Sequence, residues 1–210
     1  EVNAAPGFRM HLAPTEGFPR NVAEQVIDML YPPGSSARIP IIAVTGTNGK
    51  TTTVRIIAHI MKTIGRKVGY STTDGIYIQN RMLERGDCSG PVSAKFVLQD
   101  PTVDLAILEC ARGGILRAGL GFDYCDIGIV TNIAADHLGL QDINTVEQLA
   151  RVKSVVVESV TRDGYAILNA DDDLVFNMIK KLNCNVALFS MNERNPHITE
   201  HCKGGGIAAI

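Results

Sequence analysis

Apolar positions near the start of the chain predict one short helix followed by a break. Residues 1–19 are rich in proline and glycine and show no clear period. Five apolar residues then recur at the spacing of one helical face, which predicts an amphipathic helix over roughly residues 20–30: Val22, Ala23, Val26, Ile27 and Leu30. Residues 31–38 hold two prolines and several small polar residues, which end a helix and are typical of a linker. We therefore place a domain boundary near residue 38.

Beyond residue 38, short apolar runs alternate with segments of helical period. The apolar runs predict strands at 41–45, 67–72, 104–109, 126–131, 165–169 and 186–190. Helices are expected at 51–64, 91–99, 144–161 and 172–182, with a hairpin over 74–85 that turns at Gln79-Asn80. Asn144 is the expected N-cap of the 144–161 helix, because Glu147 three residues later fits a capping box. Strands that alternate with helices predict an α/β fold with a mostly parallel sheet covered on both faces.

Composition and charge narrow the class of protein. Of the 210 residues, 45% are hydrophobic and 20% are charged, a balance typical of a folded globular chain. The net charge of −2 gives no reason to expect a nucleic-acid partner. No apolar run reaches the roughly 18 residues of a membrane span, so no membrane partner is expected. Five widely spaced cysteines favour reduced thiols in a cytoplasmic protein over a disulfide framework.

The strongest chemical signal is a glycine-rich segment between the 41–45 strand and the 51–64 helix. It reads Gly46-Thr47-Asn48-Gly49-Lys50-Thr51-Thr52. Glycines let successive N–H groups face one anion, and the helix N-terminus adds partial positive charge, so the segment predicts a P-loop. Lys50 could reach the outer phosphates and the Thr51 hydroxyl could bind Mg²⁺. Val44 stands where the longer GxxxxGK[ST] pattern has its first glycine, and a turn that binds nothing is the alternative.

Polar residues also follow two other strands. Glu109 ends the 104–109 strand, and its hard oxygens suit Mg²⁺, although an acid at a strand end can simply be solvated. After Asn132, Ile133 replaces the lysine of the guanine-reading Asn-Lys-x-Asp motif, so guanine recognition is not expected. His137 follows on the same side of the predicted sheet. We predict that His137 binds a metal ion, with a packed or surface histidine as the alternative.

Taken together, these residues resemble the ATP-binding central domain of Mur ligases and folylpolyglutamate synthetases, a P-loop NTPase-like fold. The resemblance extends over residues 41–190 and rests on residues 46–51, Glu109, Asn132-x-x-x-Asp136-His137, Lys153 and Asn169-Ala-Asp171-Asp172. It implies an ATP-dependent ligase in which a carboxylate becomes an acyl phosphate that an amine then attacks. The catalytic residues that it implies are Lys50, His137 and Lys153.

The resemblance also implies a ligand for each matching residue. ATP would contact Gly46, Thr47, Asn48, Gly49, Lys50, Thr51, Thr52 and, through adenine, Asn169. Two Mg²⁺ ions would be held by Thr51, Thr73, Glu109, His137 and a carbamylated Lys153, since a carbamate offers anionic oxygens where an ammonium would repel the metal. Alternatives remain open: Thr73 in a simple turn, Lys153 as a solvated surface residue, and Asp171 and Asp172 as helix caps. Arg112, Arg117 and Gly113-Gly114 either shape the substrate side or begin a closely packed helix.

Three segments, residues 1–11, 107–117 and 136–142, more specifically resemble the cyanophycin synthetase family. That resemblance implies an ATP-grasp remnant at 1–19, a helix and linker at 20–38, and a C-terminally truncated Mur ligase-like domain at 39–210. It implies a homo-oligomeric full-length enzyme that adds arginine to the β-carboxylates of an aspartate polymer, with the fragment alone inactive. A different Mur-type ligase and a P-loop regulator without ligase activity are the alternatives.

Overall fold

The computed structural model describes residues 7–32, 34, 38–135, 138–139 and 143–210. The chain divides into two compact units, Glu1–Arg38 and Ile39–Ile210. In the first unit, α1 (Arg9–Leu12) and α2 (Val22–Leu30) carry no fully buried residue. Asn21 caps α2, because its Oδ1 accepts the N–H of Glu24 at 3.1 Å. The predicted helix near 20–30 is confirmed, whereas the assignment of residues 1–19 to an ATP-grasp domain stays a prediction.

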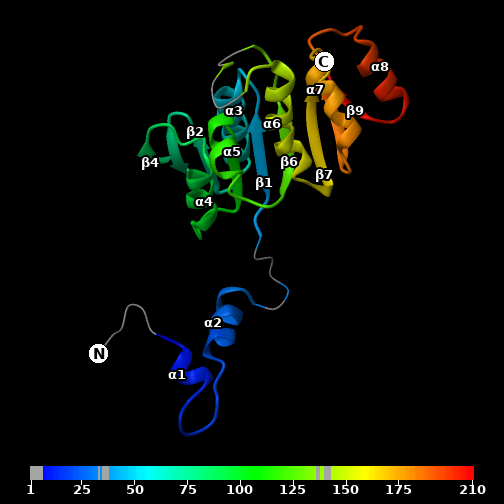
Figure 1. The fold of residues 1–210 in the computed structure, drawn as a ribbon. Coiled ribbons are helices and arrows are strands. Elements are labelled where there is room, and N and C mark those ends of the chain that lie inside the picture. The colour runs from blue at the N-terminus through cyan, green and yellow to red at the C-terminus, as the bar shows by residue number, and fades with distance from the viewer. Residues whose placement is uncertain (1–6, 33, 35–37, 136–137, 140–142) are drawn as a thin grey trace. The chain divides into compact units, whose positions relative to one another are not determined.

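The second unit is built on one sheet, which among the described residues has nine strands in the order β4-β3-β2-β5-β1-β6-β7-β8-β9 (Figure 1). The strands are β1 (Ile41–Thr45), β2 (Val68–Thr72), β3 (Gly75–Ile78), β4 (Arg81–Arg85), β5 (Leu105–Glu109), β6 (Cys125–Val130), β7 (Val160–Asn169), β8 (Asn185–Phe189) and β9 (Ile207–Ala209). Among the strands described, the antiparallel pairs are β2 with β3 and β3 with β4, and the other pairs are parallel. The predicted mostly parallel α/β fold is therefore confirmed.

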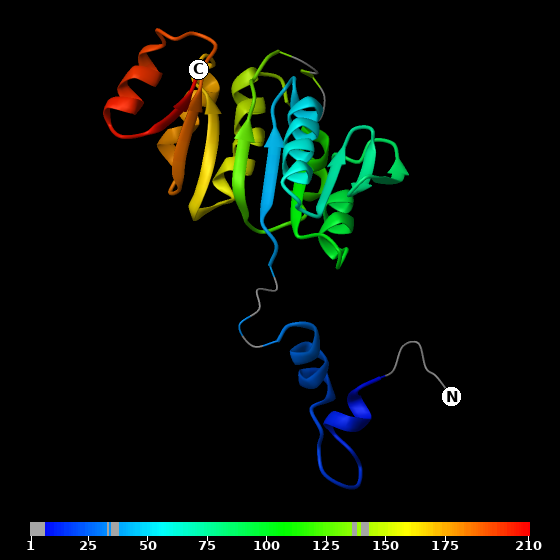
Figure 2. The ribbon, with the colours of Figure 1, turned by 180° about the vertical axis from the view of Figure 1, so that it is seen from behind.

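Helices cover both faces of this sheet. They are α3 (Lys50–Thr63), α4 (Pro91–Gln99), α5 (Arg112–Ala118), α6 (Val146–Glu158), α7 (Asp173–Phe176), the 3₁₀ helix η1 (Asn177–Lys181) and α8 (Pro196–Lys203). The views from the two sides show α3 on one face and α4, α5 and α6 on the other (Figure 1, Figure 2). Among the described residues, no helix is long and apolar enough to cross a membrane.

The central strands β1, β2 and β5 are buried along their whole length. Ile42, Val44 and Ile107 pack with Val54 and Ala58 of α3. The alternate strand residues belong to the core on the opposite face, which includes Ala43, Ala106 and Leu108. Each fully buried aliphatic side chain contributes about 1.5–3 kcal/mol, so this core holds the three strands firmly. Their carboxyl ends, where the candidate site lies, are fixed with them.

Several boundaries differ from those expected, and β7 begins at Val160 rather than at residue 165. The cap of α6 is Thr145 rather than Asn144, and its capping-box partner is Gln148 rather than Glu147. Gln148 Oε1 accepts N–H groups from both Asn144 and Thr145, at 2.7 and 3.1 Å, which favours this register. The helix expected at 144–161 ends at Glu158 because the β-branched residues that follow begin β7. The helix expected at 172–182 is split into α7 and η1.

Candidate functional site

The loop between β1 and α3 depends on glycine at two positions. Gly46 has a φ of 141° and Gly49 a φ of 83°, both in the region that favours glycine. A Cβ on Gly46 would collide with Oγ1 of Thr131, which follows β6. Around Gly49 a Cβ would meet no atom within 4 Å, so only its backbone conformation demands glycine. The predicted P-loop thus forms a tight turn at the N-terminus of α3.

Residues after β6 hold this loop in place. The Asn132 side chain binds Asn48 at two points, since its Oδ1 accepts the N–H at 3.0 Å and its Nδ2 donates to the carbonyl at 3.1 Å. The main-chain carbonyl of Asn132 accepts the N–H of Thr47 at 2.8 Å. Oγ1 of Thr131 also donates to the Asn48 carbonyl at 2.6 Å. Asn132, which the sequence offered only as part of a longer motif, therefore clamps the loop backbone.

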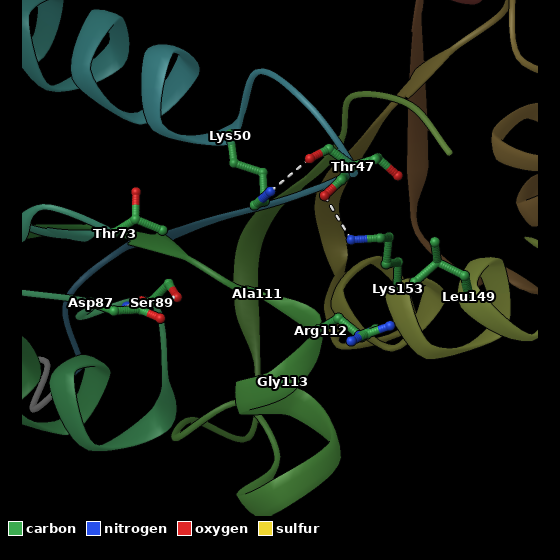
Figure 3. A pocket seen from close by; sticks show the side chains of 11 residues that line it. Thr47, Lys50, Thr73, Asp87, Ser89, Ala111, Arg112, Gly113, Leu149 and Lys153 are labelled. Atoms are coloured by element: carbon green, nitrogen blue, oxygen red, sulfur yellow. Dashed lines mark hydrogen bonds between the residues drawn. The ribbon is translucent and has the colours of Figure 1, made fainter. Parts of the chain in front are cut away.

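Two lysines donate hydrogen bonds to carbonyls of the same loop (Figure 3). Lys50 Nζ donates to the Thr47 carbonyl at 2.9 Å, and Lys153 Nζ donates to the Gly46 carbonyl at 2.6 Å. Lys153 comes from α6 and is only 3% exposed, so it is not a solvated surface residue. A buried amine needs hydrogen-bond acceptors, which the loop carbonyl provides. Both lysines lie beside the loop that we predict to bind phosphate.

Three oxygen-bearing residues converge where α3, β2 and β5 meet. Glu109 Oε2 accepts the hydroxyl of Thr51 at 2.8 Å and the N–H of Thr73 at 3.2 Å. The hydroxyls of Thr51 and Thr73 lie 3.1 Å apart. Glu109 is 2% exposed, and its Oε1 is buried without a hydrogen-bond partner in the described part of the chain. A buried carboxylate oxygen is costly to leave unpaired, and a Mg²⁺ ion would supply the missing partner.

Two further residues, His137 and Lys153, were predicted to bind metal together with Thr51, Thr73 and Glu109. His137 lies outside the described residues, so its metal role stays a prediction, as does carbamylation of Lys153. Within the described ranges no three His, Cys, Asp or Glu side chains form a metal-binding cluster. One carboxylate and two threonine hydroxyls nevertheless fit Mg²⁺, which commonly takes few protein ligands and completes its shell with phosphates and waters.

Two cavities border the loop. One, of about 250 Å³, is rich in charged and polar groups and is lined by Gly46, Thr47, Lys50, Thr73, Asp87, Ser89, Ala111, Arg112, Gly113, Leu149 and Lys153. The other, of about 580 Å³, has apolar walls beside polar groups and is lined by Asn48, Gly49, Thr53, Ile129, Thr131, Asn132, Ile167, Asn169 and Phe189. We call them the polar cavity and the apolar cavity. Thr52, the last residue of the motif, lies exposed in the first turn of α3.

The acidic and amide residues after β7 have hydrogen-bond partners within the chain, several of them distant in sequence. Asn169 lines the apolar cavity, and its Nδ2 donates to the Thr131 carbonyl at 2.9 Å. Asp172 caps α7 by accepting the N–H groups of Leu174 and Val175. The helix-cap alternative is thus confirmed for Asp172. Asp171 accepts hydrogen bonds from three groups of the segment after β8, and these bonds, led by that of the Ser190 hydroxyl, lower its pKa. Asp171 thus anchors that segment.

The polar cavity contains residues that the sequence did not single out. Asp87 and Ser89 lie in the segment between β4 and α4, where the only signal was an Asp-x-Ser turn after the hairpin. The N–H of Ala111 donates to the Ser89 carbonyl at 3.1 Å, which joins this segment to the start of α5. A Cβ on Gly114 would lie 2.9 Å from the Cα of Gly90. The glycine pair therefore begins a closely packed helix, whose first residue, Arg112, also lines the cavity.

Comparison with known proteins shows the family of the chain. The Mur ligase middle domain family matches residues 44–207. A cyanophycin synthetase from Geminocystis herdmanii (strain PCC 6308) is 61% identical over 210 residues, which is 100% of this chain and 24% of that protein. The chain therefore spans about a quarter of the length of this relative.

Solved structures share the fold at lower identity. A UDP-N-acetylmuramoyl-L-alanyl-D-glutamate–2,6-diaminopimelate ligase superposes with a TM-score of 0.65 at 24% identity, covering 81% of this chain and 35% of that one. A bifunctional folylpolyglutamate synthase/dihydrofolate synthase with Mn, AMPPNP and L-glutamate bound gives a TM-score of 0.52 at 22% identity, covering 87% and 50%. At these identities the likeness shows the fold alone.

Proposed function

Because the chain belongs to the Mur ligase middle domain family, we propose that it forms the ATP-binding part of an ATP-dependent amide ligase. The observation that carries the proposal is the convergence of Thr51, Thr73 and Glu109 beside the glycine loop, with one Glu109 oxygen buried and unpaired. Because the chain spans 24% of its relative from Geminocystis, the activity is proposed for a longer enzyme of which this chain is one part.

The loop is suited to hold the phosphates of ATP. Its backbone is fixed by Asn132, and the N-terminus of α3 adds partial positive charge. Lys50 would exchange the Thr47 carbonyl for a phosphate oxygen, which is a stronger, charge-assisted acceptor. A Mg²⁺ ion held by Thr51, Thr73 and Glu109 would neutralise phosphate charge. A second ion at Glu109, His137 and carbamylated Lys153 is part of the same proposal and rests on the resemblance.

The apolar cavity on the other side of the loop is suited to the adenine ring. Ile129, Ile167 and Phe189 supply apolar and aromatic surface, and the Asn169 amide offers polar contacts at the ring edge. Asn48 and Gly49 line the same cavity, so a ring bound there would lie next to the phosphate loop. This adjacency supports ATP as the nucleotide ligand.

The polar cavity is suited to the acceptor carboxylate. Lys50 and Arg112 bring positive charge to it, and Lys50 lies against the loop. In the proposed reaction a carboxylate oxygen attacks the γ-phosphorus, the bond to ADP breaks, and an acyl phosphate forms. An amine then attacks the acyl carbon and inorganic phosphate leaves. Fixed positive charge stabilises the anionic phosphoryl group during the first step.

For the substrates, we extend the proposal to arginine and an aspartate polymer. It is supported by the 61% identity to a cyanophycin synthetase and by the cationic lining of the polar cavity, which suits a polyanionic acceptor. The α-amino group of arginine would be joined to the aspartate β-carboxylate.

The test is a ligation assay of the intact enzyme that contains this chain. ADP release should require both an aspartate-based acceptor and arginine, and labelled arginine should enter the polymer. ADP release without incorporation would instead support a nucleotide-binding regulator. Incorporation of a different amino acid, with arginine inert, would support another Mur-type ligase.

A further inference from the structure

The polar cavity is divided by charge. Asp87 and Ser89 lie on one side of it, whereas Arg112 and Lys153 lie on the other, with Lys50 near the loop (Figure 3). The positive groups Lys50 and Arg112 have an evident use in the proposed function, because phosphate and the acceptor carboxylate are anions. The carboxylate of Asp87 has no such use, because it would repel both the phosphate and the acceptor carboxylate.

Asp87 is held in a fixed position. Its Oδ1 accepts hydrogen bonds from the hydroxyl and the N–H of Ser89, at 2.6 and 3.2 Å. Ser89 is 4% exposed, and its carbonyl is bonded to Ala111 at the start of α5. The intervening Cys88 donates its N–H to the Thr72 carbonyl at 3.0 Å. The segment therefore presents the carboxylate from a stiff wall.

The second oxygen of this carboxylate is available to a ligand. In the described part of the chain no hydrogen bond reaches Asp87 Oδ2, and the residue is solvent-exposed. An acid beside a phosphate-binding loop lowers anion affinity unless the substrate itself brings a cation that pairs with it. The cavity thus matches a substrate that carries a carboxylate and, a short distance away, a positive group.

We propose that Asp87 is a specificity-determining residue that binds a guanidinium group of the substrate. This inference rests on the proposed function, which supplies the guanidinium from one of two sources. It belongs either to an arginine already attached to the acceptor chain or to the incoming free arginine. A guanidinium is planar and offers paired N–H donors that match a carboxylate.

The experiment compares arginine with citrulline, its neutral analogue, in the intact wild-type enzyme and in Asp87→Asn. In one arm the acceptor chain carries arginine or citrulline side chains, and in the other the free amino acid is varied. In at least one arm, kcat/KM of the wild-type enzyme should be higher with arginine than with citrulline. D87N should reduce this arginine-to-citrulline ratio of kcat/KM roughly tenfold. The affected arm identifies the source of the guanidinium. An unchanged ratio in both arms overturns the inference.

A matched control is Asp100→Asn. Asp100 Oδ1 accepts the N–H and hydroxyl of Thr102 at 2.8 and 2.7 Å, the same turn as Asp87–Ser89 but outside the polar cavity. D100N should leave the arginine preference unchanged, and an equal effect of both variants would overturn the inference. Should D87N fail to bind ATP, Ser89→Ala serves instead, because it keeps the charge but frees the carboxylate. It should lower the ratio roughly two- to threefold, and no change overturns the inference.

The two proposals fail differently. A wild-type enzyme that joins no arginine to any acceptor refutes the proposed function. A wild-type enzyme that joins arginine, with its preference over citrulline intact in D87N and S89A, refutes only the role of Asp87.

Discussion

The hydroxyl of Thr51 lies 2.8 Å from Oε2 of Glu109, although 58 residues separate the two along the chain. Thr51 stands in the first turn of α3 and Glu109 at the carboxyl end of β5. Because β5 pairs in parallel with β1, the strand that leads into the glycine loop, the acid and the hydroxyl meet at the same edge of the sheet. Sheet topology thus assembles the candidate metal site from distant residues.

Replacing Glu109 with glutamine should remove magnesium dependence from nucleotide binding. The amide keeps an acceptor for the Thr51 hydroxyl but loses the negative charge that a divalent cation requires. We expect ATP affinity in the presence of Mg²⁺ to fall roughly 100-fold, to the value measured with EDTA, in a titration with a fluorescent ATP analogue. Glu84→Gln, an exposed acid in β4, is the control. Full Mg²⁺ dependence in E109Q would contradict the assignment.

The two loop glycines should differ in their tolerance of alanine. Gly46→Ala forces a Cβ against Oγ1 of Thr131 at an unfavourable φ, so it should destabilise the chain by about 2–3 kcal/mol and abolish ATP binding. Gly49→Ala meets only the backbone strain, about 1 kcal/mol. Urea denaturation of both variants measures the difference. Equal losses would argue against the contact between Gly46 and Thr131.

Asn132→Ala should weaken both nucleotide binding and folding. The substitution removes both side-chain hydrogen bonds to the Asn48 backbone, so the loop would have to be ordered by the nucleotide itself. We expect ATP affinity to fall roughly tenfold and the free energy of unfolding to fall by about 1–2 kcal/mol. Asn132→Asp keeps the acceptor but loses the donor, so its ATP affinity should lie between those of the wild type and N132A. Unchanged affinity in N132A would remove Asn132 from the loop-positioning role.

Lys50→Ala and Lys153→Ala in the intact enzyme should each abolish arginine incorporation. Each removes an amine that lies beside the glycine loop and borders the polar cavity. The measurement is transfer of labelled arginine to an aspartate polymer, with Lys95→Ala, an exposed lysine in α4 outside the polar cavity, as the control. Full activity in K153A would also contradict the proposal that Lys153 is carbamylated.

Asp171 should make the unfolding free energy depend on pH on the acid side. Its hydrogen bonds lower its pKa in the folded state, so their stabilisation is present above the ordinary Asp pKa of 3.8. It is lost as the pH falls through the lowered folded-state value. Asp171→Asn should therefore be less stable than wild type near neutral pH, with the difference shrinking at pH values below about 4. A difference that does not change with pH would show that the charge of Asp171 is not what stabilises the segment.

Much of the fold could be read from apolar periodicity because the central strands are buried on both faces and appear as plain apolar runs. The cap of α6 could not, since Asn144 and Thr145 are comparable caps and the choice depends on which N–H groups Gln148 reaches. The start of α5 was also ambiguous, because two glycines oppose a helix and only the close packing of Gly114 against Gly90 favours it.

Some residues of the candidate site could be predicted from the sequence and others could not. Lys50, Thr51 and Glu109 stand at the ends of recognisable elements, so their positions in the sequence were sufficient. Asp87 became visible only through the fold, because the link between Ser89 and Ala111 brings two separate segments to the wall of one cavity. Local sequence carries no record of such a link.

The strand order also has a kinetic consequence. Val44 of β1 pairs with Glu109 and Thr45 pairs with Val130, so the strand that leads into the glycine loop has no partner nearby in the chain. Such high contact order slows folding, because long loops must close before the paired strands stabilise one another. The clamp on Asn48 by Asn132 can form only after β6 has joined β1. Nucleotide binding should therefore appear late during refolding, after most helical structure has formed.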